Sequence, residues 1–198
     1  MQEHYYSSKQ DSEQRFSNFS AVLRGFNLEF KTVSGVFSLK RIDRGTQVLA
    51  KYMLIKKGTM LDLGCGYGAI GIVYAKSCPE CRVYMVDINP RAVAMAKYNA
   101  KKNKISNYKV LQSDVFSEIK DIMFDSILLN PPQTAGRDIC IRMIKEAYEH
   151  MNKNGIFQMV ARHNKGGKTL MECVNDTFKN VDVLAKSGGY WVYKAVKK

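Results

Sequence analysis

The sequence lacks the hydrophobic segments that would place a protein in or across a membrane. No apolar run reaches the length of a transmembrane helix, and residues 1–5 do not open a signal-peptide hydrophobic region. Pro- or Ser-rich linkers, low-complexity segments and internal repeats are also missing. The 198 residues, 45% of them hydrophobic, are enough to bury a substantial core. We therefore expect a cytoplasmic protein with a single domain over residues 1–198.

The cysteines and histidines are too few and too scattered to predict a disulfide framework or a metal site. The five cysteines are an odd number, at positions 65, 78, 81, 140 and 173, which argues against a disulfide framework. Cys78 and Cys81 form one C-x-x-C motif, but no second pair completes a zinc site, and a strand rather than a helix follows. We expect this motif to be a helix-to-strand loop. We expect no metal site, because the three histidines have no evident partners.

Acidic residues are in short supply. Asp and Glu number 18 against 31 Lys and Arg, which gives a net charge of +13. A charge of this sign and size suggests a polyanionic partner, and nucleic acid is favoured over a membrane because no amphipathic anchor is evident. A generally basic proteome would give the same charge, so the charge alone leaves both explanations open.

From Thr59 onward the chain alternates between two hydrophobic patterns. Apolar runs bounded by turn residues predict strands near 59–63, 82–87, 108–112, 124–130, 155–161, 181–185 and 190–196. Helical spacing predicts helices near 69–77, 90–101, 137–151 and 167–178. Such alternation implies an α/β fold, a mostly parallel sheet with helices on both faces.

The first 40 residues are expected to form a short β extension of a core at residues 41–198. Two apolar runs predict a hairpin that turns at Gly25-Phe-Asn27. Asp43 is expected to cap a helix over residues 47–54.

The stretch Thr59-Met-Leu-Asp-Leu-Gly-Cys-Gly-Tyr-Gly-Ala-Ile-Gly71 predicts a nucleotide-binding turn. A buried strand ends in three glycines and a helix opens, so free backbone N–H groups face a ligand. Gly66 to Gly71 matches the dinucleotide fingerprint, with Asp87 where a ribose-binding acid is expected, which allows NAD(P). Asp62 at the strand tip would repel a pyrophosphate but suits the cationic amino group of S-adenosylmethionine. We favour the methyl donor.

Three acids occupy the tips of three successive strands of this region. Asp87 can accept hydrogen bonds from both ribose hydroxyls, and Asp114 can meet the adenine amino group. Each acid by itself could equally be a helix cap. Asp62, Asp87 and Asp114 at three successive tips favour a shared ligand.

Asn130-Pro131-Pro132 follows the apolar run 124–129. The Asn side-chain oxygen can accept one hydrogen of a substrate NH₂ group, and a backbone carbonyl held open by the prolines can accept the other. Both bonds direct the nitrogen lone pair toward the methyl group, so the transfer needs mostly positioning. Asn-Pro-Pro alone is usually a turn; at this strand tip we expect all three residues to be catalytic.

Together these motifs resemble the class I S-adenosylmethionine-dependent methyltransferases. His4-Tyr-Tyr-Ser, Ser34-Gly-Val-Phe-Ser38 and Asp43-Arg-Gly-Thr46 are further similar to the catalytic domain of the small-subunit ribosomal RNA (guanine-N2) methyltransferase C family, including its short archaeal and bacterial members. The resemblance implies a Rossmann-like, seven-stranded sheet with an antiparallel last strand, and methylation of a guanine amine in 16S ribosomal RNA. It implies cofactor contacts from Thr46, Asp62, Gly64, Cys65, Gly66, Gly68, Asp87, Ile88, Asp114, Val115 and Asn130.

RNA contacts are expected at the same edge of the sheet. The basic, glycine-containing loop after a strand predicts phosphate contacts from Arg162, His163, Lys165 and Lys168, and Arg137 follows the Asn130 loop. Many relatives place an aromatic residue after Asn-Pro-Pro, where this chain has Gln133, so Phe37 or Tyr190 with Trp191 is expected to stack on the base. The run Lys101, Lys102 and Lys104 is expected mainly to be solvated.

The expected partner is ribosomal RNA or a partly assembled small subunit. The Asn130-Pro131-Pro132 motif indicates only that the substrate has a planar NH₂ group, so another RNA base or a protein glutamine is an alternative substrate. A non-catalytic RNA-binding module is the alternative from a different functional class.

Overall fold

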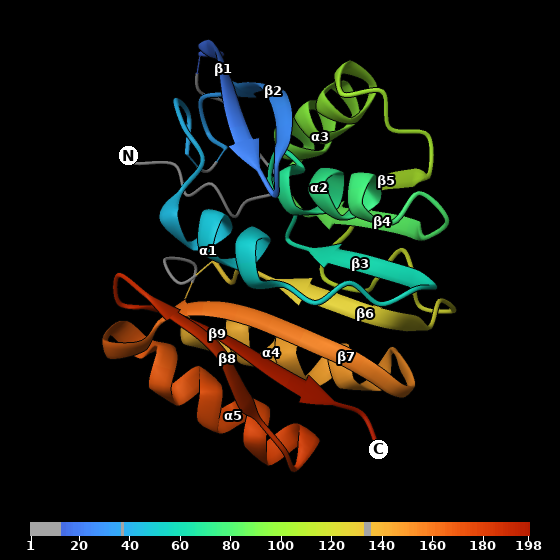
Figure 1. Ribbon diagram of the computed structural model, residues 1–198, viewed down its shortest axis with the longest axis vertical. Helices are drawn as coiled ribbons and strands as arrows, with labels where there is room; N and C mark the ends of the chain where they lie inside the picture. The colour runs from blue at the N-terminus through green and yellow to red at the C-terminus, as the bar shows by residue number, and fades with distance from the viewer. Residues whose placement is uncertain (1–12, 37, 133–135) are drawn as a thin grey trace.

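A seven-stranded sheet forms the centre of the molecule (Figure 1). The computed structural model describes residues 13–36, 38–132 and 136–198. The strand order is β5-β4-β3-β6-β7-β9-β8. The strands are β3 (Thr59–Leu63), β4 (Arg82–Asp87), β5 (Tyr108–Gln112), β6 (Phe124–Leu129), β7 (Met151–Arg162), β8 (Asp182–Ser187) and β9 (Tyr190–Val196).

Strand β9 alone runs against its neighbours in this sheet. Pairs β3–β4, β3–β6, β4–β5 and β6–β7 are parallel, whereas β9 is antiparallel to both β7 and β8. The predicted mostly parallel, seven-stranded sheet with an antiparallel last strand is therefore confirmed. The carboxyl ends of β3, β4 and β6 meet at one edge, where ligands bind in folds of this kind.

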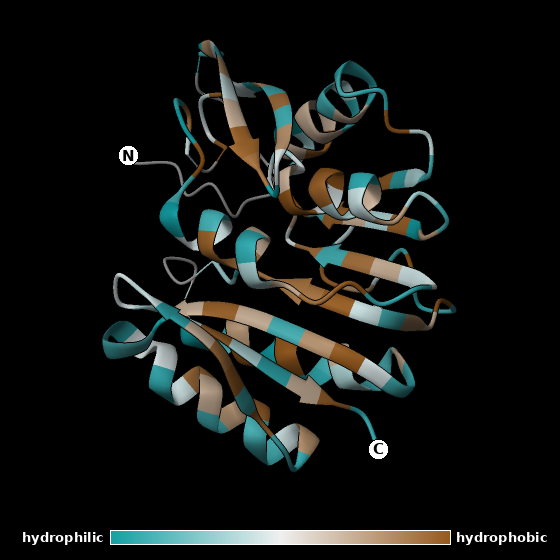
Figure 2. Ribbon diagram, viewed as in Figure 1, coloured by the Kyte–Doolittle hydropathy of each residue, from teal (hydrophilic) through white to brown (hydrophobic). Residues whose placement is uncertain are grey.

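Helices cover both faces of the sheet, as predicted. On one face lie α1 (Arg44–Tyr52), α2 (Ala69–Ser77) and α3 (Pro90–Lys102); on the other lie α4 (Arg137–Glu149) and α5 (Lys168–Phe178). Figure 2 shows the hydrophobic colour concentrated in the strands and in α2. Residues 69–75 of α2 are all buried, because α1, α3 and the amino-terminal hairpin surround it.

The amino-terminal hairpin is longer than predicted. Strands β1 (Phe16–Leu23) and β2 (Phe26–Val33) pair antiparallel and join through Arg24 and Gly25, both at positive φ, rather than through Gly25-Phe-Asn27. A two-residue turn of this kind matches the twist of the strands. Arg24 also bonds the carbonyls at the end of α1, which holds the turn in place.

Three boundaries differ from the predicted ones. Helix α1 begins at Arg44 instead of residue 47, although Asp43 caps it as expected by accepting from the N–H of Thr46. Helix α4 ends at Glu149 rather than at residue 151, and β7 begins at Met151 rather than at residue 155. Asn154 has a φ of 63°, within an irregularity of the β6–β7 pairing.

The Cys78–Cys81 motif lies in the loop between α2 and β4, as predicted, but it is closed by a disulfide. The expectation of a plain loop was wrong on this point: the argument against a disulfide framework does not exclude one local bridge between cysteines three residues apart.

Within the described ranges, every helix is too short or too polar to span a bilayer.

Candidate active site

A pocket opens at the carboxyl edge of β3, β4 and β6. Most residues predicted to bind a cofactor or to be catalytic line it: Thr46, Asp62, Gly64, Cys65, Gly66, Asp87, Asn130, Pro131 and Pro132. The sequence had not assigned the other lining residues to a binding site; they are Val36, Asp43, Tyr67, Ala69, Ile70, Asn89 and Ala92. The structure thus brings together residues from β3, β4, β6 and the start of α1.

The glycine turn provides the floor of this pocket. Gly64, Gly66 and Gly68 have φ values of 72°, 56° and 89°, a region that favours glycine. A Cβ on Gly66 would meet no atom within 4 Å and would stand in open space. No side chain therefore covers the backbone of Gly66 on the side from which a ligand approaches. Gly68 does not line the pocket; it is the N-cap residue of α2 and lies close to Ala96.

Asp62 lies beneath this turn with its carboxylate turned toward α2. Its Oδ2 accepts from the N–H of Gly71 at 2.8 Å, and only 4% of the residue is exposed. The pKa of this carboxyl is raised to about 7, mainly by burial and in smaller part by the neighbouring charge of Asp87, against the lowering effect of the Gly71 bond. A cationic group in the pocket would stabilise the ionised form.

Asp87 binds the backbone on both sides of the pocket. Its Oδ2 accepts from Gly66 N at 2.8 Å and its Oδ1 accepts from Asn89 N at 2.9 Å. Burial raises the pKa of Asp87 to about 6 despite these bonds. An ionised carboxylate has about four acceptor positions, so both oxygens can also accept from ligand hydroxyls.

Asn130 is held in one orientation by two side chains of the α1 segment. Its Nδ2 donates to Thr46 Oγ1 at 3.0 Å and to Asp43 Oδ1 at 3.3 Å. A carboxylate can only accept, so the nitrogen must face Asp43 and the side-chain oxygen must face away. No described residue donates to that oxygen, which leaves it ready to accept from a substrate.

Asp43 is therefore a site residue that the sequence had indicated only as a helix cap. The same Oδ1 serves both purposes, because it also accepts from Thr46 N at 3.0 Å. Its place in the Asp-Arg-Gly-Thr segment was the available signal.

Tyr67 contributes a buried polar atom to the pocket. It is 4% exposed, and its hydroxyl has no hydrogen-bond partner among the described residues. Phe19 and Phe30 pack edge-on against its ring, and burial strongly raises its pKa, so the hydroxyl stays protonated. The hydroxyl is therefore a buried donor without a hydrogen-bond partner among the described residues.

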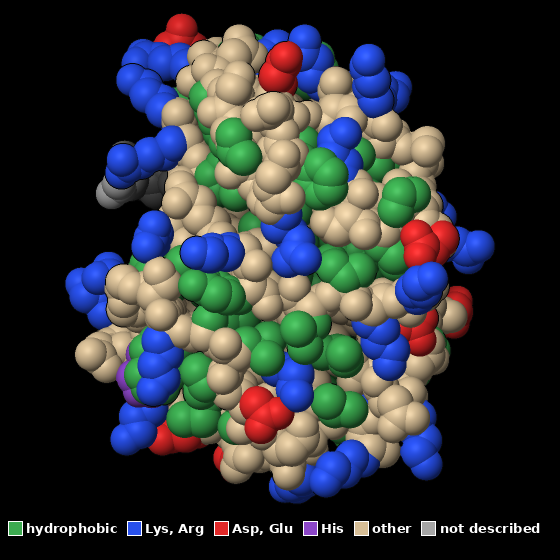
Figure 3. Space-filling model, viewed as in Figure 1, with side chains coloured by type: hydrophobic (Ala, Val, Ile, Leu, Met, Phe, Trp, Pro, Cys, Tyr) green, Lys and Arg blue, Asp and Glu red, His purple; other side chains and the backbone are tan. Residues whose placement is uncertain are grey.

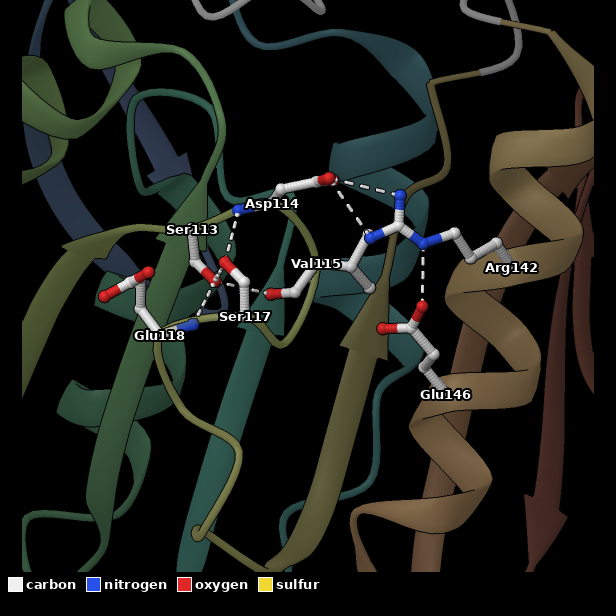
Figure 4. A network of polar contacts seen from close by, with 7 residues as sticks. All are labelled: Ser113, Asp114, Val115, Ser117, Glu118, Arg142 and Glu146. Atoms are coloured by element: carbon white, nitrogen blue, oxygen red, sulfur yellow. Dashed lines mark hydrogen bonds and ion pairs between the residues drawn. The ribbon is translucent and has the colours of Figure 1, made fainter.

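Asp114 is not among the residues that line the pocket. Its carboxylate pairs with Arg142 of α4 at 3.2 Å, and Arg142 also pairs with Glu146 at 2.7 Å (Figure 4). The adjacent Val115 has a φ of 53°, which is strained for a β-branched residue, and its carbonyl accepts from Ser113 Oγ. Ile88, whose carbonyl accepts from Gln112 Nε2, also lies outside the pocket lining.

Only some of the predicted RNA-contacting residues lie at the pocket. Tyr190 and Arg162 lie at the pocket side: the Tyr190 ring approaches Gly45, and the Arg162 guanidinium lies 5.7 Å from that ring. The His163 ring instead stacks on the Trp191 ring, with 3.6 Å between the ring centroids, and its Nδ1 lies 2.8 Å from Tyr193 Oη. The predicted cations Arg137, Lys165 and Lys168 are exposed, and Phe37 and Gln133 lie outside the described residues.

The donors and acceptors of the pocket fit S-adenosylmethionine better than NAD(P). Asp62 decides between the two ligands, because its buried carboxylate would repel a pyrophosphate and suits an amino group. Asp87 can bind the ribose hydroxyls of either ligand. Bare backbone at Gly66 leaves room for the ligand.

Comparison with known proteins gives consistent matches. Residues 27–194 match the family model of the methyltransferase small domain. The chain is 36% identical over its whole length to all of the uncharacterized protein YbxB of Bacillus subtilis. It is 36% identical over 172 residues to ribosomal RNA small subunit methyltransferase C of Haemophilus influenzae, covering 84% of this chain and 51% of that protein. The chain thus spans about half the length of the methyltransferase C relatives it matches.

A solved structure, the T. thermophilus 16S rRNA N2 methyltransferase in complex with AdoMet and guanosine, superposes with a TM-score of 0.82. The match covers 92% of this chain and 51% of the other at 24% identity, so it shows the fold.

Proposed function

The chain belongs to the methyltransferase small-domain family, and from that premise we propose that it methylates an exocyclic amino group, most specifically guanine N2 of 16S ribosomal RNA. The cofactor is S-adenosylmethionine, which supplies an electrophilic methyl group. Asp62 and Asp87 bind its amino group and ribose hydroxyls, and the glycine turn approaches it closely.

The observation that carries this proposal is the orientation of Asn130. Because Asp43 and Thr46 hold its nitrogen, its oxygen can accept one hydrogen of a planar NH₂ group. Pro131 and Pro132 have no backbone N–H, so neither residue can donate a hydrogen bond to the backbone carbonyls of this turn. The two acceptors fix the amine plane, and transfer then requires positioning rather than a strong base.

Tyr190 provides the stacking surface for the target base. The position of a Cβ on Gly45 would lie 3.2 Å from both Tyr190 Cε1 and Asn130 Oδ1. The aromatic ring and the acceptor therefore lie on the same side of Gly45, a few ångströms apart. Arg162 lies over the ring and can bind a phosphate beside the stacked base.

Several relatives carry the name of a ribosomal RNA methyltransferase, and the basic charge of +13 suits an RNA substrate. A base that is paired must leave its helix to reach Asn130, so a partly assembled subunit or an exposed loop is the expected substrate.

The test is methyl transfer from labelled S-adenosylmethionine to total RNA, ribosomal subunits and protein, followed by nucleoside mass spectrometry. The proposal predicts N2-methylguanosine in small-subunit RNA. Another methylated base, or label in a protein glutamine alone, would refute the guanine assignment while retaining the planar amine. No transfer to any fraction would favour a non-catalytic binding module.

A further inference from the structure

A groove lined by cations lies beside the candidate active site, between β1 and α1. Its volume is about 530 Å³. The cations that line it are Arg24, Lys40, Arg41, Arg44 and Lys51. No Asp or Glu stands among its lining residues in the described part of the chain. Figure 3 shows Lys and Arg side chains gathered over α1 and the segment that leads into it.

These five cations are exposed and carry uncompensated charge. None of them forms an ion pair within residues 13–36, 38–132 and 136–198. Arg24 is fixed by bonds to the carbonyls at the end of α1, and Arg44 donates to Ser187 Oγ at 3.0 Å. Both contacts orient a guanidinium without neutralising it. Five like charges around one concavity favour an anionic occupant.

The groove leads to the reaction centre. Arg44 lies between Asp43, which orients Asn130, and Gly45, which faces Asn130 and Tyr190. Its partner Ser187 ends β8, and the following turn leads into Tyr190, under the Arg162 guanidinium. A flexible polyanion in the groove would therefore pass Asn130 and reach Arg162.

We propose that this groove, here called the α1 groove, binds the phosphate backbone of the RNA substrate next to the target nucleotide. The inference rests on the proposed function for the identity of the polyanion. A concave channel with cations on both sides suits a strand of phosphates better than a flat lipid surface. The exposed Tyr52 ring, 5.2 Å from Lys51 Nζ, can stack on a flanking base.

The test compares two triple variants that remove the same charge. Lys40→Ala/Arg41→Ala/Lys51→Ala removes three of the five cations that line the groove. Lys97→Ala/Lys101→Ala/Lys104→Ala removes three exposed lysines on and after α3, which also lack ion pairs among the described residues. Binding of a fluorescent single-stranded RNA oligonucleotide is followed by anisotropy over a range of KCl concentrations.

We expect the groove variant to flatten the plot of log K against log salt by about two units, since each phosphate contact on a single strand contributes roughly 0.7. If the lines meet near 1 M salt, affinity at 0.1 M falls about 100-fold. The α3 variant should keep the wild-type slope. Equal slopes for all three proteins, or a loss confined to the α3 variant, would overturn the proposal.

Two further measurements separate the possible failures. Restoring charge with Lys40→Arg/Arg41→Lys/Lys51→Arg should restore the slope, and failure to do so would contradict an electrostatic role. Titration with S-adenosylhomocysteine and the methyl-transfer assay test the proposed function independently of RNA binding. Binding to anionic phospholipid vesicles that only the groove variant loses, with RNA binding unchanged, would assign the groove to a membrane and overturn the proposal.

Discussion

Replacing Asp43 tests whether this residue positions Asn130 or merely caps a helix. Its Oδ1 accepts from Thr46 N at 3.0 Å and from Asn130 Nδ2 at 3.3 Å. Asp43→Ala removes both bonds. Asp43→Asn keeps an oxygen for both donors but removes the charge, and Asn caps a helix as well as Asp does. The two variants therefore separate the roles.

The structure sets different magnitudes for stability and for catalysis. Loss of the cap in Asp43→Ala should lower the free energy of unfolding by about 1 kcal/mol, and Tm by roughly 2–4 °C in a chain of this size. A hydrogen bond to a charged group contributes about 1.5–3 kcal/mol. The 3.3 Å distance and the remaining Thr46 bond favour the lower end, so the rate of methyl transfer should fall about 10-fold.

Thermal unfolding and single-turnover transfer at saturating cofactor check these values. Asp43→Asn should keep the wild-type Tm and lose roughly three-fold in rate, because a neutral bond has about half the strength. Cofactor affinity should be unchanged in both variants. A wild-type rate in Asp43→Ala together with a lower Tm would show that Asp43 is only a helix cap.

Two other predictions concern the pocket floor and its packing. The pKa of Asp62 is about 7 in the folded state against an ordinary 3.8, so the folded state binds more protons than the unfolded state between these pH values. The contribution of Asp62 to the free energy of unfolding therefore falls by up to about 4 kcal/mol as pH rises from 4 to 7. Unfolding titrations of Asp62→Asn should lose this part of the pH dependence, and an unchanged profile would contradict the prediction. Gly71→Ala would bring a Cβ within 2.5 Å of Met85 Cγ and Sδ, which should destabilise the protein by about 1–3 kcal/mol; an unaltered Tm would show that Met85 has room to move.

The sequence predicted the sheet and most of the pocket because local patterns encode them. An apolar run that is followed by Gly64 or Asn130 shows in the sequence itself where the strand ends. The parallel topology then brings the carboxyl ends of these strands to one edge of the sheet. The hairpin turn was misplaced because Arg24 at positive φ is stabilised by α1 carbonyls 26 to 29 residues away. No local pattern contains that contact.

Long-range partners also decide the roles of side chains that the sequence left uncertain. Asp114 meets Arg142, which lies 28 residues further along the chain, and Asp43 meets Asn130, which lies 87 residues further. The α1 groove likewise joins β1 to α1 and the β8 end, so its five cations are scattered in the sequence.

The role of Asn130 in methyl transfer is tested by comparing wild type with Asn130→Ala in methyl transfer to small-subunit RNA and in calorimetric titration with S-adenosylhomocysteine. Asn130 accepts a hydrogen bond from the substrate amine, and Asp62, Asp87 and the glycine turn provide the main contacts to the cofactor, beside which Asn130 is a minor one. We expect Asn130→Ala to lower the rate of N2-methylguanosine formation by about 100-fold, with cofactor affinity and Tm unchanged. Retained transfer in Asn130→Ala, or wild-type protein that binds NADH but not S-adenosylhomocysteine, would contradict it.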